Sequence, residues 1–451
     1  MTEIRLDKSL PSEQERVGQP SVPAEGLERY FAREGVDPLP YAFEGKIAVH
    51  PGLGGSGVEK QDFEATLEPL LAEPRTGKTV AYIHVPFCET HCLYCGFYNK
   101  AYREDESRIY ADALIQELRL WRGRPGQDAG PVHAVYMGGG TPTALQADDL
   151  RRILKEVRAV LPLANDCEIT VEGRLSNFGP DKMEACFEGG ANRFSLGVQS
   201  FDTEIRQAMG RVSDRDTLIR QLQLLQSYDQ AAVIVDLIYG FPMQTMERWL
   251  ADIATAQSLK LDGADCYQLN VYRNTPLAKA IESGRLPAGA DVPMQSAMFA
   301  AGVKAMQKGF YRRLSISHWA RTSRERNLYN LYVKGRAHCL AFGPGAGGNL
   351  DGFFYLNQSG TFSKSVVNIS CCNIFLCKCI VPAGKDHRHS GMIFFCFYRA
   401  VSDLYPRHIR NLISFSGLQA SRHKAKVPDS FSLHVFLPLC FYQKLPQQII
   451  S

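Results

Sequence analysis

The sequence has no apolar run of about 20 residues, the length that a helix needs to cross a bilayer. It also lacks a strong excess of one charge, because the formal net charge is only +4 over 451 residues. The segment from Met1 to Arg16 is charged, unlike the apolar core of a secretory signal. We therefore expect a cytoplasmic protein with no membrane span and no nucleic-acid partner.

Cysteine is present, with 13 residues in all, but without the regular spacing of a disulfide framework. Three of them, Cys88, Cys92 and Cys95, stand at the spacing C-x3-C-x2-C after an apolar, β-rich stretch. Three close thiolates suit a soft metal or an iron–sulfur cluster. We favour a [4Fe–4S] cluster with one iron left open to a small molecule. The alternatives are structural zinc with His91 as a fourth ligand, or three unconnected cysteines.

Strands and helices alternate from residue 79 onward, as the apolar spacing indicates. The expected strands are 79–85, 132–137, 168–171, 193–197, 232–238 and 264–271. The expected helices are 105–121, 147–160, 180–188, 214–228 and 244–259. This rhythm predicts an α/β protein with a partial (β/α)6 TIM-like barrel, and an open doubly wound sheet is the alternative. In such barrels chemistry gathers at the carboxyl ends of the strands, where the cysteine loop lies.

Ligand-binding side chains are expected at the ends of the following strands. Gly138 and Gly139, with Thr141 close behind, lie in a glycine run where a ligand can reach bare backbone. Glu172 ends the third strand, and its carboxylate can accept hydrogen bonds from a ribose or an ammonium group. A tight turn and a solvated acid are the alternative readings.

Three more residues continue this pattern. Gln199 ends the fourth strand, and Arg211 follows with a guanidinium able to clamp a carboxylate through two hydrogen bonds. Asp236 lies inside an apolar strand, where a charge needs a partner. We expect these side chains to converge on one ligand.

The stretch from Tyr82 to Phe97 resembles the radical S-adenosylmethionine (SAM) signature, in the form found in oxygen-independent coproporphyrinogen III oxidases. The resemblance implies that Cys88, Cys92 and Cys95 hold the cluster, and that SAM binds its open iron and is split to a 5′-deoxyadenosyl radical. It also implies a set of SAM-site residues, of which Tyr94 is expected beside the cluster: Tyr82, Tyr94, Gly138, Gly139, Thr141, Glu172, Gln199, Arg211 and Asp236.

After residue 271 the alternation is expected to stop. We predict a helix at 294–308, a strand at 311–318, a short helix at 325–333 and a glycine-rich loop at 341–348. The runs 315–320 and 324–332 combine a histidine, a tryptophan, tyrosines and arginines, which suits a flat tetrapyrrole with carboxylate side chains. His318 and Tyr329 are the candidate catalytic residues, and ordinary packing is the alternative.

With 50–55 and 95–97, these runs resemble the anaerobilin synthases over about residues 27–357. That family implies SAM-dependent methylation and opening of haem with release of iron. We expect an electron donor of the flavodoxin or reduced-flavin type. A coproporphyrinogen III dehydrogenase is one alternative, although its motif has a cysteine where Phe97 stands. A haem chaperone on the same scaffold is the other.

Four segments follow from these patterns. By analogy with the resembled family, we expect residues 1–75 to form an N-terminal arm and lid, 76–275 the radical SAM core, and 276–358 a substrate-side region that is shorter than in the family. Residues 359–451 depart from the family and hold six cysteines with no clear period. We interpret this last segment as an unrelated, poorly ordered tail rather than as a second iron–sulfur site.

Overall fold

The computed structural model describes residues 56–57, 62–335, 337–357 and 374–378. The predictions for the arm and for most of the tail lie outside these residues. One large sheet has the order β1-β15-β14-β13-β12-β2-β5-β6-β7-β8-β9-β11-β10. Its centre is a run of seven parallel strands: β12 (His338–Phe342), β2 (Thr79–Val85), β5 (Val132–Gly139), β6 (Leu163–Gly173), β7 (Arg193–Gln199), β8 (Ala232–Tyr239) and β9 (Gly263–Gln268).

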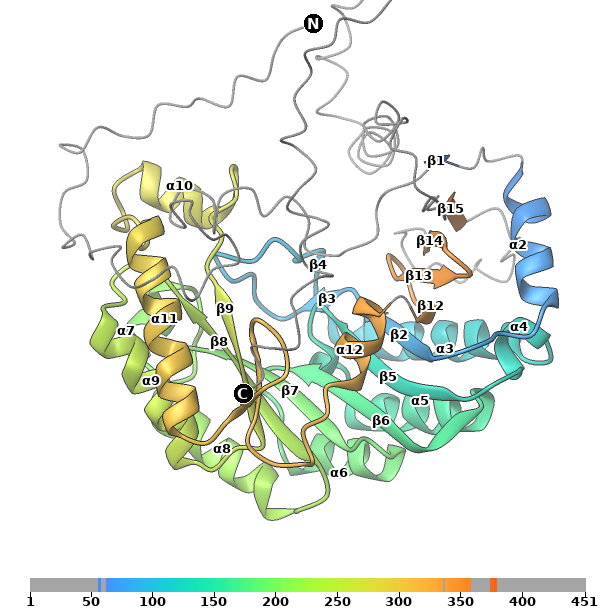
Figure 1. Ribbon diagram of the computed structural model, residues 1–451, viewed down its shortest axis with the longest axis horizontal. Coiled ribbons are helices and arrows are strands. Elements are labelled where there is room, and N and C mark those ends of the chain that lie inside the picture. The colour runs from blue at the N-terminus through green and yellow to red at the C-terminus, as the bar shows by residue number, and fades with distance from the viewer. Residues whose placement is uncertain (1–55, 58–61, 336, 358–373, 379–451) are drawn as a thin grey trace, which may run out of the picture.

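The long helices form an arc along the outside of this sheet (Figure 1). They are α3 (Glu104–Trp121), α5 (Ala147–Val160), α6 (Pro180–Gly189), α8 (Arg215–Ser227), α9 (Met246–Ser258) and α11 (Val292–Lys308). Strands β2 and β5 to β9 are neighbours in chain order, without the reversal of order that a doubly wound sheet has. The predicted partial barrel is therefore confirmed, and among the described strands the two sheet edges do not meet.

The sheet is apolar outside and polar inside. Outward side chains such as Ile83, Val135 and Leu196 are buried against the helices. The alternate, inward positions carry polar groups: Tyr82 lies opposite Tyr136, Glu172 opposite Ser195, and Asp236 opposite Asp265. Outer packing thus holds the fold together and leaves the concave face available for chemistry.

Helix starts on the outside are fixed by local capping. A side-chain oxygen accepts a backbone N–H at the start of α7 (Thr203–Ala208), α8, α9, α10 (Pro276–Glu282) and α11. Such a cap contributes about 1 kcal/mol. The capping residues are Asp202, Asp214, Thr245, Thr275 and Asp291.

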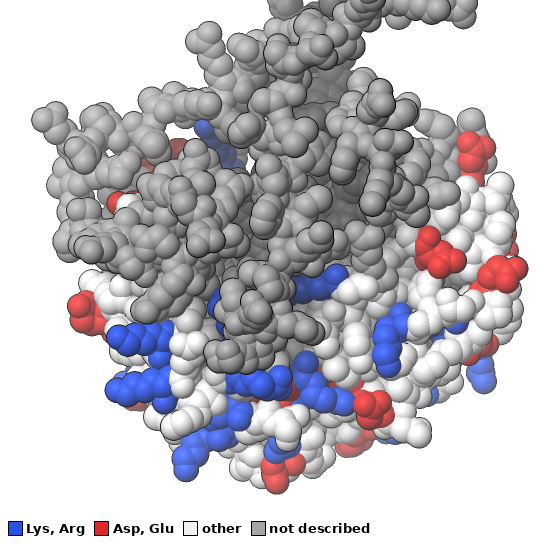
Figure 2. All heavy atoms as spheres, in the orientation of Figure 1, with Lys and Arg blue, Asp and Glu red and all other residues white. Residues whose placement is uncertain are grey.

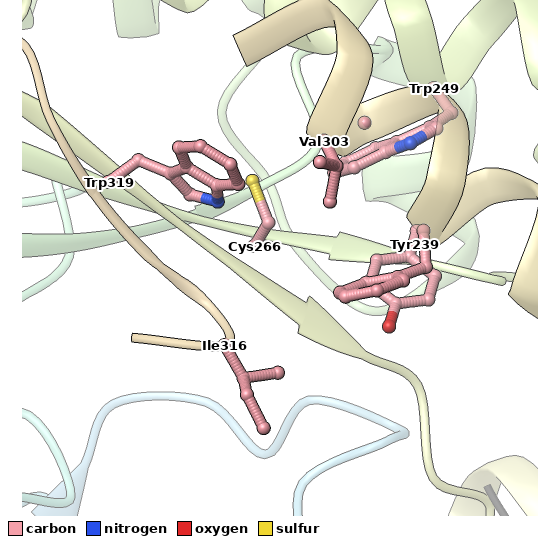
Figure 3. A pocket seen from close by; sticks show the side chains of 8 residues that line it. Tyr239, Trp249, Cys266, Val303, Ile316 and Trp319 are labelled. Carbon is pink, nitrogen blue, oxygen red and sulfur yellow. The ribbon is translucent and has the colours of Figure 1, made fainter. Parts of the chain in front are cut away.

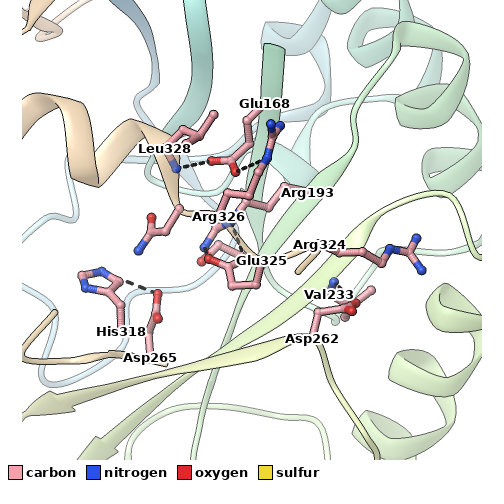
Figure 4. Close-up of polar contacts among 12 residues, drawn as sticks. Glu168, Arg193, Val233, Asp262, Asp265, His318, Arg324, Glu325, Arg326 and Leu328 are labelled. Carbon is pink, nitrogen blue, oxygen red and sulfur yellow. Dashed lines mark hydrogen bonds and ion pairs between the residues drawn. The ribbon is translucent and has the colours of Figure 1, made fainter. Parts of the chain in front are cut away.

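The amino ends of the strands are closed by the segment between β11 (His318–Ala320) and α12 (Leu328–Lys334) (Figure 4). Arg193, the first residue of β7, donates two hydrogen bonds to Glu325 at 2.9 and 3.0 Å, and both side chains are only 1% exposed. Arg324 forms an ion pair with Asp229, which lies just ahead of β8. Arg326 forms an ion pair with Asp166, which lies near the start of β6. These two arginines therefore lie at the end of the sheet opposite the cysteine loop, so their predicted contact with tetrapyrrole carboxylates is wrong.

Three predictions for the second half of the chain also need correction. The expected strand at 311–318 is two short antiparallel strands, β10 (Arg312–Arg313) and β11. The expected last strand of the barrel, 264–271, ends earlier, at Gln268. The alternation does not stop there, because β12 adds a seventh parallel strand beside β2.

An antiparallel extension continues from β12. The ends of the expected loop at 341–348 belong to β12 and β13, and the sheet goes on through four antiparallel strands, of which the last, β1, lies far from its partner β15 in the sequence. These strands are β13 (Gly347–Leu350), β14 (Phe353–Asn357), β15 (Ile374–Lys378) and β1 (Ser56–Gly57). Residues 374–378 of the expected tail thus pair with the sheet. The remaining elements are α2 (Phe63–Ala72), α4 (Pro125–Asp128), η4 (Pro142–Ala144), β3 (Phe87–Cys88) and β4 (Lys100–Ala101).

A small cavity of about 10 Å³ lies between β9, α9 and α11 on the outer, packed side of the sheet (Figure 3). Trp249, Cys266 and Trp319 are among its lining residues, and it has room for about one water molecule. Trp319 is therefore part of the outer packing and not of a substrate surface.

The outer surface is charged. Figure 2 shows Lys and Arg side chains gathered on the lower part of one face, with Asp and Glu among them. No helix in the described part of the chain is long and apolar enough to cross a membrane.

Candidate active site

The three predicted cluster ligands lie on a loop at the carboxyl end of β2. Cys88 ends β3 and is buried, Cys92 is buried, and Cys95 is partly exposed. The Leu93 backbone ties the loop down, because its N–H donates to the Met209 carbonyl at 3.2 Å and its carbonyl accepts from the Leu277 N–H at 3.0 Å. The loop is thus held on both sides by later parts of the barrel.

The thiols are set among hydrogen-bond donors. The Thr141 hydroxyl donates to Cys88 Sγ at 3.4 Å, and the Phe97 N–H donates to Cys95 Sγ at 3.4 Å. Burial raises the pKa of Cys88 and of Cys95, and these two hydrogen bonds lower it in part. Both thiols therefore favour the protonated form near neutral pH, so binding of iron must release their protons.

The zinc alternative finds no support in the described residues. His91 stacks on Tyr98 with ring centroids 4.1 Å apart, and its Nε2 lies 3.4 Å from the Cys95 carbonyl oxygen. Over the described parts of the chain, no three His, Cys, Asp or Glu side chains are grouped to hold a single ion. Ligands that bind separate irons of a cluster need not converge as closely.

The glycine run after β5 packs too tightly for any side chain. A Cβ on Gly138 would lie 2.5 Å from Glu172 Oε2, and a Cβ on Gly139 would lie 2.6 Å from the His84 ring. Gly139 also has φ +107°, a conformation that favours glycine. Its N–H donates to Glu172 Oε2 at 3.3 Å. Bare backbone is therefore presented beside the cysteine loop.

Two carboxyl groups face this backbone from β6 and β8. Burial, together with the nearby carboxyl of Asp236, raises the pKa of Glu172 to about 8. Burial likewise raises the pKa of Asp236 to about 6, although Arg193, the Ser195 hydroxyl and Arg211 oppose this shift. The Ser195 hydroxyl donates to Asp236 Oδ1 at 3.2 Å. A cationic ligand would favour the ionised form of both groups.

Gln199, at the end of β7, carries the clearest sign of a missing partner. Its Oε1 is buried without a hydrogen-bond partner, and its backbone is left-handed with φ +68°. Strained backbone and unpaired polar atoms in native proteins are concentrated at functional sites. The buried Arg211 lies alongside and donates from Nε to the Tyr94 hydroxyl at 3.0 Å. This corner is suited to a polar ligand.

Three tyrosines line the concave face below the carboxyl groups. Tyr329 of α12 lies 4.8 Å from Tyr136 and 6.0 Å from Tyr82 between ring centroids. Tyr82 in turn donates to or accepts from His84 Nδ1 at 3.0 Å. The three rings, inclined by 24–33° to one another, form one aromatic cluster on this face, the tyrosine floor.

His318 is buried at the side of this floor, where β11 pairs with β9. Ser315 Oγ lies 2.5 Å from its Nδ1, and the Tyr267 hydroxyl lies 3.3 Å from its Nε2. Asp265 Oδ2 is 3.7 Å from the same Nε2. Burial lowers the pKa of His318 to about 3, so the imidazole is neutral.

Comparison with known proteins identifies the family. The model of the radical SAM superfamily matches residues 82–256. Anaerobilin synthase of Escherichia coli O157:H7 is 45% identical over 345 residues, which cover 75% of this chain and 76% of that protein. The chain belongs to the radical SAM superfamily. It is a radical SAM enzyme, and its cofactors are a [4Fe–4S] cluster and SAM.

Two further relatives agree with this membership. The heme chaperone HemW of Bacillus subtilis is 29% identical over 276 residues, or 60% of this chain and 71% of that protein. The solved structure of coproporphyrinogen III oxidase (HemN) from Escherichia coli superposes with a TM-score of 0.60 at 22% identity, over 69% of this chain and 74% of that one. At that identity the structural likeness supports the radical SAM fold alone.

The structure brings the predicted site residues of this radical SAM enzyme together on one concave face. Sequence reasoning missed Asp265, Tyr267 and Arg193: the first two lie on the inward side of β9, and Arg193 begins β7 at the amino end of the same face, where Glu325 binds it. A signal was available for the first two, because they stand two residues apart in an apolar strand and so share a face. The inward direction of that face depends on the register with β8, which the sequence does not reveal.

Proposed function

We propose that Cys88, Cys92 and Cys95 hold the [4Fe–4S] cluster and that the residues around them hold SAM. The bound cluster supplies the electron that cleaves the sulfonium of SAM. The unpaired Oε1 of Gln199 and the close-packed backbone of Gly138 and Gly139 support this fit. The other proposed SAM residues are Tyr82, Tyr94, Thr141, Glu172, Arg211 and Asp236.

We infer that the substrate is haem or a related tetrapyrrole, which the enzyme methylates and opens with release of iron. The observation that carries this proposal is the 45% identity to anaerobilin synthase over three quarters of both chains. The tyrosine floor formed by Tyr82, Tyr136 and Tyr329 supports it, because clustered aromatic rings can pack against a tetrapyrrole.

In this proposal each group has a physical task. Glu172 and Asp236 bind the cationic and hydroxyl groups of SAM, and Arg211 with Gln199 binds its carboxylate. Tyr329 and the other two tyrosines orient the macrocycle and keep water away from the reacting atoms. His318 holds and passes protons beside the floor. The reductant is a flavodoxin or reduced flavin, and the reaction takes place in the cytoplasm.

Anaerobic incubation of the full chain with haem, SAM and a reductant tests the proposal. Loss of the haem Soret band with release of free iron is the expected result. Haem that stays bound and unchanged would instead indicate a haem chaperone. A product formed from coproporphyrinogen III but not from haem would indicate a dehydrogenase, the role that the Phe97 position argues against.

A further inference from the structure

A chain of polar contacts runs through the buried His318 and joins groups that are accessible at both ends. His318 is only 4% exposed, whereas Ser315 and Tyr267 are partly exposed. Lys334, on the exposed side of α12, donates from Nζ to Ser315 Oγ at 3.4 Å. Ser315 then contacts Nδ1 at 2.5 Å, and Tyr267 contacts Nε2 at 3.3 Å. The path from amine to phenol is therefore continuous.

The inner end of this path faces the concave side of the sheet. Tyr267 is on β9, two residues after Asp265 and nearer the carboxyl end of the strand. Burial raises the pKa of the Tyr267 phenol, Asp265, Asp236 and Tyr136 raise it further, and Arg193 opposes them. These neighbours come from β9, β8, β5 and β7, so the phenol lies among the inward groups of four strands. It is thus on the same face as the tyrosine floor.

The central histidine is in the form that a relay needs. Lys334 and Arg193 add to the effect of burial in lowering the pKa of His318, which keeps the ring neutral. A neutral imidazole has one nitrogen that donates and one that accepts, so it can take a proton on one side and release one on the other. Asp265 Oδ2 lies 3.7 Å from Nε2, and burial raises the pKa of this carboxyl well above its usual range.

We propose that Ser315, His318 and Tyr267 form a proton relay that delivers protons from Lys334 and solvent to a tetrapyrrole on the concave face. The inference rests on the proposed function. When ferrous iron leaves a dianionic tetrapyrrole, the iron–nitrogen bonds break and two nitrogens take up protons, with no change in electron count.

Each proton moves in a balanced sequence along the relay. The Tyr267 O–H gives its proton to a tetrapyrrole nitrogen, and the phenolate regains one from the His318 Nε2–H. His318 Nδ1 takes the Ser315 proton, and Ser315 is restored by the Lys334 ammonium, which solvent reprotonates. The imidazole returns to its Nε2–H tautomer before the second proton moves. The relay accordingly assigns to His318 a role in proton supply, whereas direct contact with the reacting carbon is not required.

The test compares variants of the relay in the full chain under anaerobic turnover with haem, SAM and reductant. The measured quantities are the rate of iron release to a chelator and its solvent isotope effect in D2O. His318→Ala is expected to slow iron release by about tenfold or more, the low end of the range for general acid–base catalysis, with partial rescue by added imidazole. An unchanged rate and isotope effect would overturn the relay.

Two serine variants keep the test independent of any folding defect at the buried histidine. Ser317 Oγ lies 3.3 Å from the same Nδ1 and can replace a missing Ser315. The double variant Ser315→Ala with Ser317→Ala should therefore slow iron release more than either single change. Ser315→Thr retains the hydroxyl and should keep the wild-type rate. If the double variant matches the wild type, the relay is wrong.

The outcomes also separate the relay from the function on which it rests. A wild-type enzyme that consumes no haem would refute the proposed function, and the relay with it. A wild-type enzyme that consumes haem, beside relay variants that do so equally fast, would refute the relay alone. Measuring 5′-deoxyadenosine in the same samples shows whether a slow variant has lost proton delivery or SAM cleavage.

Discussion

The two ends of the parallel sheet differ in how their buried polar groups are paired. At the amino end the buried charges of Arg193 and Glu325 satisfy each other through two hydrogen bonds. At the carboxyl end Gln199 is left-handed with an unpaired oxygen, and Glu172 and Asp236 carry raised pKa values. The comparison teaches that Arg193 and Glu325 stabilise one end, while the other retains strained and unpaired polar groups of the kind found at functional sites.

Loss of one cluster thiolate should abolish both iron binding and SAM cleavage at the carboxyl end of the sheet. We expect Cys88→Ala, Cys92→Ala and Cys95→Ala each to lose the cluster iron and SAM cleavage down to background, because three ligands hold the cluster. Iron content and 5′-deoxyadenosine formation under anaerobic conditions measure this. Cys186→Ala is the matched control, since Cys186 is buried like Cys88 and Cys92 but lies on the outer helix α6. Full iron in any of the three variants would refute the assignment.

Loss of one partner of the Arg193–Glu325 pair should be the largest stability effect at the amino end. Arg193→Met leaves a buried carboxylate without its partner, which costs about 3–5 kcal/mol in the free energy of unfolding. The double variant Arg193→Met with Glu325→Leu should recover most of that loss. Urea unfolding measures both. Arg324→Ala removes a much more exposed ion pair and should cost less than about 1 kcal/mol. Equal losses in the two single variants would contradict the comparison.

Local sequence patterns were sufficient for the elements of the core. The predicted helix 147–160 has the ends of α5, and all six expected strands are present, because apolar periodicity reflects burial on one side. Strand β12 was missed because it is a strand only through its pairing with β2, far away in the chain. The predicted strand at 311–318 failed because its middle turns out of the sheet.

Sequence patterns marked candidate site residues at strand ends, and Asp236 within a strand as a charge among apolar neighbours, but they did not pair residues that lie far apart in the chain. Glycines and polar residues after an apolar run mark a strand end from the sequence alone. Arg193 and Glu325 are separated by 132 residues and Tyr267 and His318 by 51, so only the folded chain shows these pairs. Arg324 and Arg326 show the converse: residue types that suit a substrate are used in surface ion pairs.

Two residues with left-handed backbone, one at each end of the sheet, test the comparison with a smaller expected effect. Gln199→Gly removes backbone strain, so it should cost no stability, but it should weaken SAM binding by about tenfold, or 1.4 kcal/mol. Lys260→Gly makes the same change at a left-handed residue ahead of β9, at the amino end, and should leave SAM binding unchanged. Equilibrium SAM binding and urea unfolding measure these effects. Equal SAM affinity in both variants would remove Gln199 from the site.

The pH dependence of stability gives the smallest effect and the finest distinction. Because burial raises the pKa of Glu172 to about 8, the folded chain holds a proton there that the unfolded chain has lost above about pH 4.5. Stability from this group is therefore highest at low pH and falls as the pH rises toward about 8. In Glu172→Gln the fall between pH 6 and 8.5, measured by urea unfolding without SAM, should be smaller than in the wild type. Glu188→Gln changes an exposed acid whose pKa Arg151 lowers, so it should leave that interval unaltered. A wild-type slope in Glu172→Gln would mean that this carboxyl is ionised before any ligand arrives, and that the carboxyl end of the sheet is less desolvated than its packing indicates.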